Sequence, residues 1–525
     1  MTIDEMPATI TAAAVVTDRA DRTDLAVDSL AGRIQAHASL TPDAPAVVDG
    51  TRTTSYAELL AVATGSVAAL PGCTDDRVAV VVHKTTATVA LVLGCLVARR
   101  PVLLLAPTML PERRDAVLRD AGILHLVDDP ERLATPGIPA TSSGPDRAQG
   151  PASGTDDALL LTTSGTTGTP KVVPLGRTAI DRFVLWAGEE LALGPGTTVL
   201  SLAPLNFDIS LLDVWATLAA GGRAVLVPPT RAVRGRVVLD LLESERAEVV
   251  QAVPTFFRLM IDAAAGRQVP GVREVVLTGE PVDHATVAGV RRVFPSARVR
   301  NVYGMTETND SLMHVLTGDE PTDRPVPVGH PLPGVDVLVH TEDGGYAPFG
   351  DGELLVRTPF QADRYLGDRG SAERFVTVWT SRGSREYVRT GDLVRRRPGE
   401  PAVLVGRVDR RVKVRGIAVD LADVELVLEE HPMVTAAAVV AETDDLEGHR
   451  LAGVVRRSPG SDLDLVTLRR YCTSRLPTGS TLPELHLTDE PFPLTITGKT
   501  DRPRTLRAAR QEHERTRHGH HAHHL

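Results

Sequence analysis

The 525-residue sequence predicts an α/β protein: a large N-terminal domain with layered sheets and a β-rich subdomain, then a small α+β domain. Three observations lead to this fold class. Strand-like and helix-like segments alternate up to about residue 325, and Gly and Pro become more frequent beyond it. A helix and strand pattern of about a hundred residues then follows RVKVRG (411–416). At about 100–200 residues per domain, two to four domains are expected.

The first domain opens with a βαβ pattern. VAVVV (78–82) and PVLLL (101–105) are short apolar runs bounded by breakers, and the segment between them has a helical pattern. A Pro/Gly/Ser-rich surface connection is expected over 135–158. Apolar strands that end in Gly, Pro, Ser or Thr follow, and active-site loops of open α/β sheets leave from such ends. The strands are expected in LLLTTSGTTGTPK, RAVLVPP, EVVQAVP, REVVLTGE and ARVRNVYGMTE.

Four segments divide the chain. We expect an N-terminal extension at 1–25, the core at 26–408, a C-terminal domain at 409–505 and a His-rich tail at 506–525. The tail is expected to be solvated, although a histidine cluster can also bind metal.

Charge and cysteine content exclude several classes of function. The net charge is -10, from 57 basic and 67 acidic side chains, and no long basic run offers a nucleic-acid surface. Cys73, Cys95 and Cys472 lie far apart without metal-ligand spacing. No apolar run approaches the ~20 residues that span a bilayer, and the acidic N-terminus does not resemble a signal peptide. We therefore expect a cytoplasmic protein with no membrane or nucleic-acid partner.

Lysine is scarce, which singles out the lysines that remain. It occurs only at 84, 171, 413 and 499. Lys171 ends TTSGTTGTPK (162–171), which follows a buried strand pattern. Glycines and small hydroxyl residues let such a loop aim N–H and O–H groups at one anion, and a lysine adds a point charge. The segment predicts a phosphate-binding loop that consists of Thr163, Ser164, Gly165, Thr166, Thr167, Gly168 and Lys171.

TSGTTGTPK resembles the phosphate loop of the adenylate-forming superfamily, which includes acyl-CoA synthetases, luciferases and adenylation domains of nonribosomal peptide synthetases. The motifs that agree, in the family's order, are GE (279–280), NVYGMTE (301–307), GELLVR (352–357), YVRTGDL (387–393), GRVDRRVKVRG (406–416) and PLTITGKTDR (493–502). The resemblance runs from about residue 30 to 505. It implies an adenylate-forming N-terminal domain and a mobile C-terminal domain.

The resemblance implies a reaction that joins a carboxylate to the α-phosphate of ATP and then passes the acyl group to a thiol. Lys499 is then the catalytic cation of the first half-reaction. Glu307 would hold Mg²⁺, Tyr303 would stack on adenine, and Asp392 would accept from the ribose hydroxyls. The further residues expected at the nucleotide are Gly279, Glu280, Asn301, Gly304, Thr306 and Arg407.

The family alternates between two domain arrangements, and the hinge position falls on Asp409. Rotation there would withdraw Lys499 and bring Lys413, the second catalytic lysine, over the adenylate. Gly416 would leave room for a pantetheine arm. Lys84 has no assigned role.

The segment PLNFDISLLD (204–213) resembles the element of amino-acid-activating members whose aspartate pairs with the substrate α-ammonium. Asp208 would take that role, because a carboxylate among apolar neighbours needs a cationic partner; the alternative is that it caps a helix at 209–219. Asp310 suggests an amine or hydroxyl on the substrate side chain, as in a diamino acid, unless it pairs with an arginine or faces water. The resemblance places the pocket at Asp208, Ile209, Leu212, Val276, Thr278, Val302, Asp310 and Ser311.

About 25 residues follow Lys499, too few for a carrier domain. We therefore expect a free-standing enzyme that activates an amino acid with ATP and Mg²⁺ and loads a separate carrier protein. The arginines at 395, 396, 397, 410 and 411 could supply a basic docking patch. One alternative is a CoA ligase for a small or aryl acid, which the motif YGMTET favours. The other is a nucleotide-binding relative without turnover.

Overall fold

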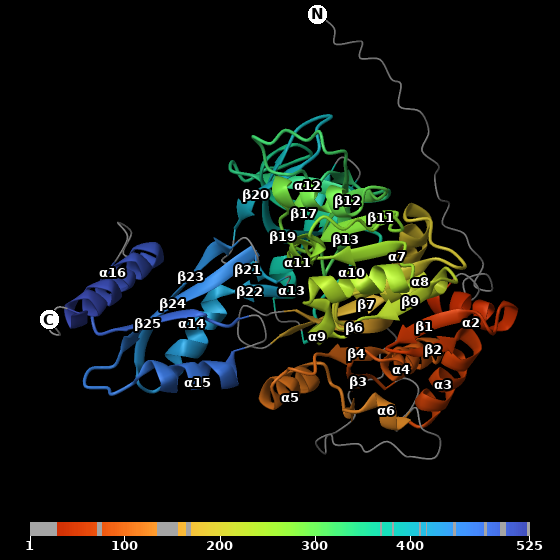
Figure 1. Cartoon of the computed structure of the whole chain (residues 1–525), viewed down its shortest axis with the longest axis horizontal. Helices are drawn as coiled ribbons and strands as arrows, with labels where there is room; N and C mark the ends of the chain where they lie inside the picture. Colours follow the sequence, from red (N-terminus) through yellow and green to blue (C-terminus); the bar gives the residue numbers. More distant parts are fainter. Residues whose placement is uncertain are drawn as a thin grey trace, which may run out of the picture.

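The computed structural model shows a large N-terminal domain and a smaller C-terminal domain set to one side of it (Figure 1). The structure describes residues 29–70, 76–133, 156–163, 170–367, 370–380, 383–408, 411–415, 417–444, 448–476, 480–493 and 500–521. The predicted N-terminal extension and most of the predicted connection 135–158 lie outside these ranges.

A five-stranded sheet contains the predicted βαβ unit. Its order is β5-β3-β4-β6-β7, and β3 and β4 pair in parallel around helix α4. Thr85 caps α4, and nearly every residue of the helix is buried, as the apolar sequence requires. The strands are β3 (Val78–Val81), β4 (Val102–Leu105), β5 (His125–Val127), β6 (Asp157–Thr163) and β7 (Lys171–Gly176).

A nine-stranded sheet positions the site. Its order is β14-β13-β12-β11-β10-β8-β9-β1-β2, and β8, β10, β11 and β12 are parallel, so their carboxyl ends meet at one edge. The strands are β1 (Pro45–Asp49), β2 (Arg52–Ser55), β8 (Thr198–Ser201), β9 (Arg223–Leu226), β10 (Val249–Ala252), β11 (Glu274–Thr278), β12 (Arg298–Met305), β13 (Asn309–Leu316) and β14 (His330–Pro331).

Helices pack around these two sheets (Figure 1). The segment after Asp208 is a π-helix, η1 (Leu211–Ala216), followed by α8 (Thr217–Ala219), rather than one regular α-helix. The others are α2 (Leu30–Leu40), α3 (Tyr56–Ala68), α4 (Thr86–Val97), α5 (Pro111–Asp120), α6 (Pro130–Leu133), α7 (Arg177–Glu190), α9 (Pro229–Ala232), α10 (Gly235–Ser244), α11 (Pro254–Ala264) and α12 (His284–Val293).

The predicted β-rich subdomain is a separate antiparallel sheet. Its order is β16-β15-β17-β19-β18, with β20 paired to β19, which brings Asp392 opposite Arg407. The elements are β15 (Asp336–Thr341), β16 (Tyr346–Ala347), β17 (Gly350–Arg357), α13 (Ser371–Arg374), β18 (Phe375–Thr380), β19 (Gly383–Arg396) and β20 (Val403–Arg407).

The C-terminal domain is the predicted α+β unit, with its own core beneath α14 and α15. The elements are β21 (Arg411–Val414), β22 (Ile417–Asp420), α14 (Leu421–Glu429), β23 (Val434–Asp444), β24 (Gly448–Arg457), α15 (Leu465–Arg475), β25 (Glu484–Thr488) and α16 (Arg502–His521).

Helix α16 corrects the predicted boundary at 505. The expected solvated tail is helical as far as His521, and Leu506 and Ala509 are buried against β24. Arg510 binds Glu442 and Glu484 at 2.6–2.8 Å. The C-terminal domain therefore includes at least the first turns of the segment predicted as a tail.

Within the described ranges, no helix has both the length and the apolar character needed to cross a membrane.

Candidate functional site

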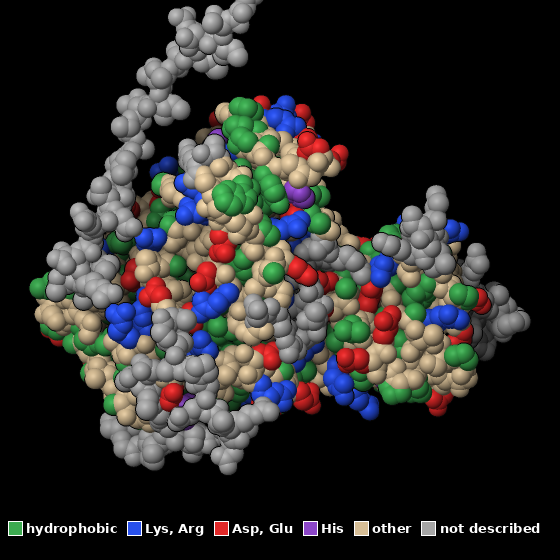
Figure 2. Space-filling model, turned by 180° about the vertical axis from the view of Figure 1, so that it is seen from behind, with side chains coloured by type: hydrophobic (Ala, Val, Ile, Leu, Met, Phe, Trp, Pro, Cys, Tyr) green, Lys and Arg blue, Asp and Glu red, His purple; other side chains and the backbone are tan. Residues whose placement is uncertain are grey.

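A cavity of about 1230 Å³ lies at the carboxyl ends of β8, β10, β11 and β12, under strand β21 of the C-terminal domain. Seen from behind, a recess separates the two domains (Figure 2). Most of the predicted site residues line this one cavity, because their strands end at the same edge of the sheet. They are Thr163, Asp208, Ile209, Leu212, Thr278, Gly279, Glu280, Asn301, Val302, Tyr303, Gly304, Thr306, Glu307, Asp310, Asp392, Arg407 and Lys413.

Several predicted residues lie outside the part of the chain that the structure describes. They are Ser164, Gly165, Thr166, Thr167 and Gly168 of the phosphate loop, the hinge residue Asp409, Gly416 and Lys499.

Three predicted residues do not line the cavity. The Lys171 ammonium lies 4.6 Å from the centre of the Tyr365 ring, over its face. Val276 packs in the hydrophobic core of the sheet. Ser311 follows Asp310 in β13, so its side chain points to the opposite face, where it donates to Asn309 O at 3.1 Å.

The predicted ribose-binding group is already hydrogen-bonded. Tyr303 donates its hydroxyl to Asp392 Oδ2 at 2.5 Å, and Arg407 donates to Asp392 Oδ1. Burial and the nearby Asp392 charge raise the pKa of Tyr303 well above its usual value, so the phenol stays protonated. These contacts fix the carboxylate at the cavity wall.

Glu307, the predicted metal ligand, is buried beside a tyrosine and an arginine. Tyr365 donates to its Oε1, and Arg374 Nε lies 3.7 Å from the same oxygen. Among the described residues, no three His, Cys, Asp or Glu side chains are grouped as a metal site. The carboxylate fits Mg²⁺ when phosphate and water oxygens supply the other ligands, which is the usual arrangement for this ion.

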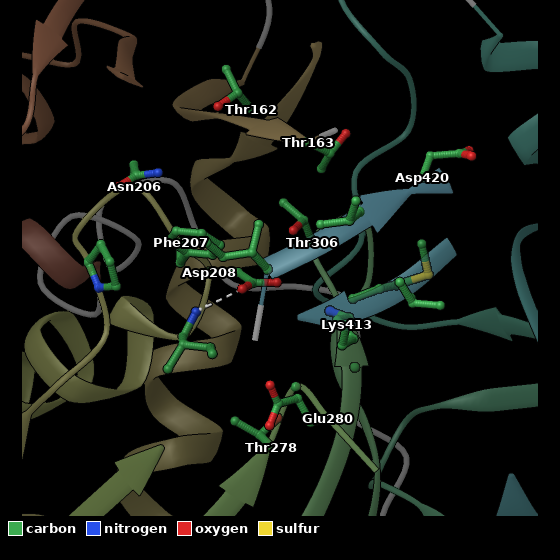
Figure 3. Close-up of a pocket in the computed structure, with 18 of the residues that line it drawn as sticks. Thr162, Thr163, Asn206, Phe207, Asp208, Thr278, Glu280, Thr306, Lys413 and Asp420 are labelled. Carbon is green, nitrogen blue, oxygen red and sulfur yellow. Dashed lines mark hydrogen bonds between the residues drawn. The ribbon is translucent and has the colours of Figure 1, made fainter. Parts of the chain in front are cut away.

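Asp208 lies within the cavity with a lysine and a threonine beside it (Figure 3). Its Oδ1 accepts from the Ile209 N–H at 2.9 Å, a contact with the next residue, and the N-cap of η1 is Ser210, so Asp208 does not cap the helix. Burial raises the pKa of Asp208, while the Lys413 charge and a hydrogen bond from Thr306 oppose the rise. The free chain thus places one cation from the C-terminal domain against this carboxylate.

A buried polar network behind Asp208 was not predicted from the sequence. Gln251, on β10, donates to Ile209 O at 2.9 Å and to Asp213 Oδ1 at 3.1 Å, which ties the residue after Asp208 to the sheet. Lys84 is 7% exposed, lines the cavity, and donates to Ala203 O at 2.5 Å. Burial lowers the pKa of Lys84 and raises that of Asp213, while the attraction between the two opposes both shifts. The scarcity of lysine was the one sequence signal that pointed to this position.

The predicted basic docking patch is largely paired within the domain. Arg395 and Arg397 both face Asp351, at 3.6 and 2.8 Å, and the Arg396 guanidinium lies 4.6 Å from the centre of the Phe349 ring. Arg410 lies outside the described residues, as does the side chain of Arg411.

Comparisons with known proteins agree with this arrangement. A family model described as AMP-binding enzyme matches residues 34–366, and one described as AMP-binding enzyme C-terminal domain matches 423–499. An L-proline–[L-prolyl-carrier protein] ligase of Pseudomonas fluorescens is 30% identical over 406 residues, 76% of this chain and 76% of that protein. The phenyloxazoline synthase MbtB of Mycobacterium sp. is 32% identical over 510 residues, 92% of this chain but only 42% of that longer protein.

The solved structure of the amide bond synthetase McbA from Marinactinospora thermotolerans has the same fold. It superposes with a TM-score of 0.75 at 26% identity, over 91% of this chain and 99% of that one. The predicted fold class and the predicted resemblance are both confirmed. The chain belongs to the AMP-binding enzymes, a family of adenylate-forming proteins that includes ligases.

Proposed function

We propose that this chain activates an amino acid as its aminoacyl adenylate and transfers it to the phosphopantetheine thiol of a separate carrier protein. The observation that carries the proposal is the position of Asp208, a carboxylate in the same cavity as Tyr303, Asp392 and Arg407. A relative that covers most of this chain is by its name a ligase between an amino acid and a carrier protein.

Asp208 would hold the substrate α-ammonium. A carboxylate at this depth needs a cation to offset its desolvation, and in the free chain Lys413 supplies part of that charge. A carboxylic acid without an α-amine would leave the Asp208 charge without that additional partner. Selection for an amine therefore follows from electrostatics rather than from shape.

ATP would bind between the β-rich sheet and β12. Tyr303 would stack on adenine, and Asp392 would accept from the ribose hydroxyls in the orientation that Tyr303 and Arg407 impose. Mg²⁺, held by Glu307, would neutralise phosphate charge when bound. The phosphate loop, including Lys171, would bind the outer phosphates. Lys499 would place its positive charge beside the substrate carboxylate and the α-phosphate.

Between the two half-reactions the C-terminal domain would rotate at Asp409, so that Lys413 replaces Lys499 at the adenylate. Lys413 lines the cavity from β21, so the described arrangement presents the face proposed for thiol transfer. We place the domain boundary between 408 and 411, with Gly416 beside the route of the pantetheine arm.

Pyrophosphate exchange tests the proposal. We expect exchange with ATP and one or a few amino acids but not with their deaminated analogues, and loading of a phosphopantetheinylated carrier, detected by mass, but not of CoA. Exchange with simple acids and formation of an acyl-CoA would instead establish a CoA ligase. Silence with every acid, from protein that binds ATP, would establish a nucleotide-binding relative without turnover.

A further inference from the structure

A second carboxylate shares the cavity with Asp208. Asp310 lies on β13, opposite Gly304 of β12, at a point where the register of the two strands shifts. A Cβ at Gly304 would lie 2.3 Å from the Asn309 carbonyl oxygen, so glycine is needed for β13 to approach this closely. The backbone thus brings Asp310 to the cavity wall near the edge where Asp208 enters.

Asp310 differs from Asp208 in having no hydrogen-bond or ion-pair partner among the residues that the structure describes. Asp208 accepts from Ile209 N and has the Lys413 charge nearby. The Asp310 side chain makes no hydrogen bond or ion pair with any residue in the described ranges. The alternative that Asp310 pairs with an arginine is therefore not supported within the described ranges.

The electrostatics at Asp310 favour a cationic ligand. Burial and the charge of Asp208 raise the pKa of Asp310 to about 7, and no cation of the described chain opposes that rise. Two carboxyl groups that repel one another in a half-buried site are both stabilised by a ligand with two positive charges. A neutral hydroxyl or amide would supply a hydrogen bond but would leave the repulsion in place.

We propose that the substrate is an amino acid with a second amine on a short side chain, with Asp208 holding the α-ammonium and Asp310 the side-chain ammonium. The inference rests on the proposed function and names its substrate class. A short side chain is expected because both carboxyl groups line the same cavity and the Asp208 charge reaches Asp310. The class includes 2,3-diaminopropionate, 2,4-diaminobutyrate and ornithine.

The experiment measures pyrophosphate exchange with these three amino acids and with neutral partners of similar size, namely serine, 2-aminobutyrate, norvaline and asparagine. We expect kcat/KM for the best diamino acid to exceed that of its neutral partner about 100-fold, since a site built for a polar group rejects the analogue that lacks it. Asp310→Asn should remove most of that preference through KM for the diamino acid, with little change for neutral amino acids.

Asp319→Asn is the matched control, because it removes an exposed carboxylate just beyond β13. The wild-type comparison decides the inference even if Asp310→Asn folds poorly. Preference for a neutral amino acid, or an unchanged preference in Asp310→Asn, would overturn this inference and leave the proposed function intact. Absence of exchange with any amino acid would overturn both.

Discussion

At the scale of single residues, the positions at which the strands end bring a few polar side chains into one cavity. Asp208, Tyr303 and Asp392 come from distant parts of the sequence and line one cavity. The position of Asp208 at the cavity was predictable, because the segment 204–213 resembles a family element and places a charged residue inside an apolar run. The motifs could not predict the buried polar network behind Asp208, since Gln251 and Lys84, which bind Ile209, Ala203 and Asp213, lie in segments without a motif. Burial of those two side chains is a tertiary property.

The hydroxyl of Tyr303 provides a residue-scale test. Tyr303→Phe keeps an aromatic ring for adenine but removes the hydrogen bond to Asp392, which leaves that carboxylate less firmly oriented. A hydrogen bond to a charged group is worth about 1.5–3 kcal/mol, so the KM for ATP should rise about 10-fold or more. The KM for the amino acid should stay the same.

Tyr387→Phe is the matched control, because Tyr387 donates to Asp336 at 2.8 Å in the same sheet but does not line the cavity. Equal ATP KM values for wild type and Tyr303→Phe would show that Asp392 does not depend on this contact.

At the scale of elements, regular strands and helices were predictable and irregular ones were not. β3, α4 and β4 follow directly from two apolar runs and a helical segment between them. The π-helix η1 was not foreseen, because a wider turn after Asp208 has no local sequence pattern. The sequence of 506–525 predicts a solvated tail, because the partners of Arg510 lie on β23 and β25, far from it in the sequence.

The Lys84–Asp213 pair links the segment after β3 to η1. Lys84→Met should lower the free energy of unfolding by about 3–5 kcal/mol, since it leaves a buried carboxylate without its cation. The loss should be larger at pH 8 than at pH 6. The reason is that Asp213, with its pKa already raised, can take up a proton at the lower pH but not at the higher one. Urea unfolding of wild type and Lys84→Met at pH 6 and at pH 8 measures this loss of stability.

Two further variants control this prediction. Lys84→Met combined with Asp213→Asn should recover more than half of the lost stability, because no buried charge remains. Arg132→Met, which breaks an exposed ion pair with Asp129, should cost no more than about 1 kcal/mol. A Lys84→Met protein as stable as wild type at pH 8 would argue that Asp213 is already neutral in the folded chain.

The stability of α16 docked on the C-terminal sheet should depend on pH. Hydrogen bonds from Arg510 lower the pKa of Glu484 from 4.5 to about 2. A carboxyl group whose pKa is depressed on folding contributes stability above its unfolded pKa and loses it as the pH falls towards the folded value. The protection of α16 amides, relative to their intrinsic exchange rate at each pH, should therefore fall between pH 4.5 and 2, and Arg510→Met should already show low protection at pH 6. Arg507→Met, an exposed change on the same helix, should behave as wild type does.

At the scale of the whole molecule, the cavity is completed by two domains. The N-terminal sheets supply most of its wall, and β21 of the C-terminal domain supplies Lys413. The sequence predicted both domains from the change in pattern after residue 416, and the family resemblance implied a hinge at Asp409. The arrangement seen here could not be predicted from the sequence, because the pattern of each domain does not specify how the two domains are oriented.

If the proposed function is correct, substitution of Lys499 and substitution of Lys413 should impair different half-reactions. Lys499→Ala should lower pyrophosphate exchange at least about 100-fold, because a cation placed on developing charge is typically worth that much. It should still transfer an aminoacyl group from supplied adenylate to the carrier. Lys413→Ala should retain exchange and lose most of the transfer. If each substitution lowered both rates equally, the proposed rotation of the C-terminal domain at Asp409 would be wrong.

The central claim is that Asp208 selects substrates by their α-amine. The most direct test compares pyrophosphate exchange for the preferred amino acid and for the 2-hydroxy acid with the same side chain, in wild type and in Asp208→Asn. The account predicts a wild-type preference for the amine of at least about 100-fold in kcat/KM, and its near disappearance in Asp208→Asn. Equal use of the two acids by the wild-type enzyme would contradict it.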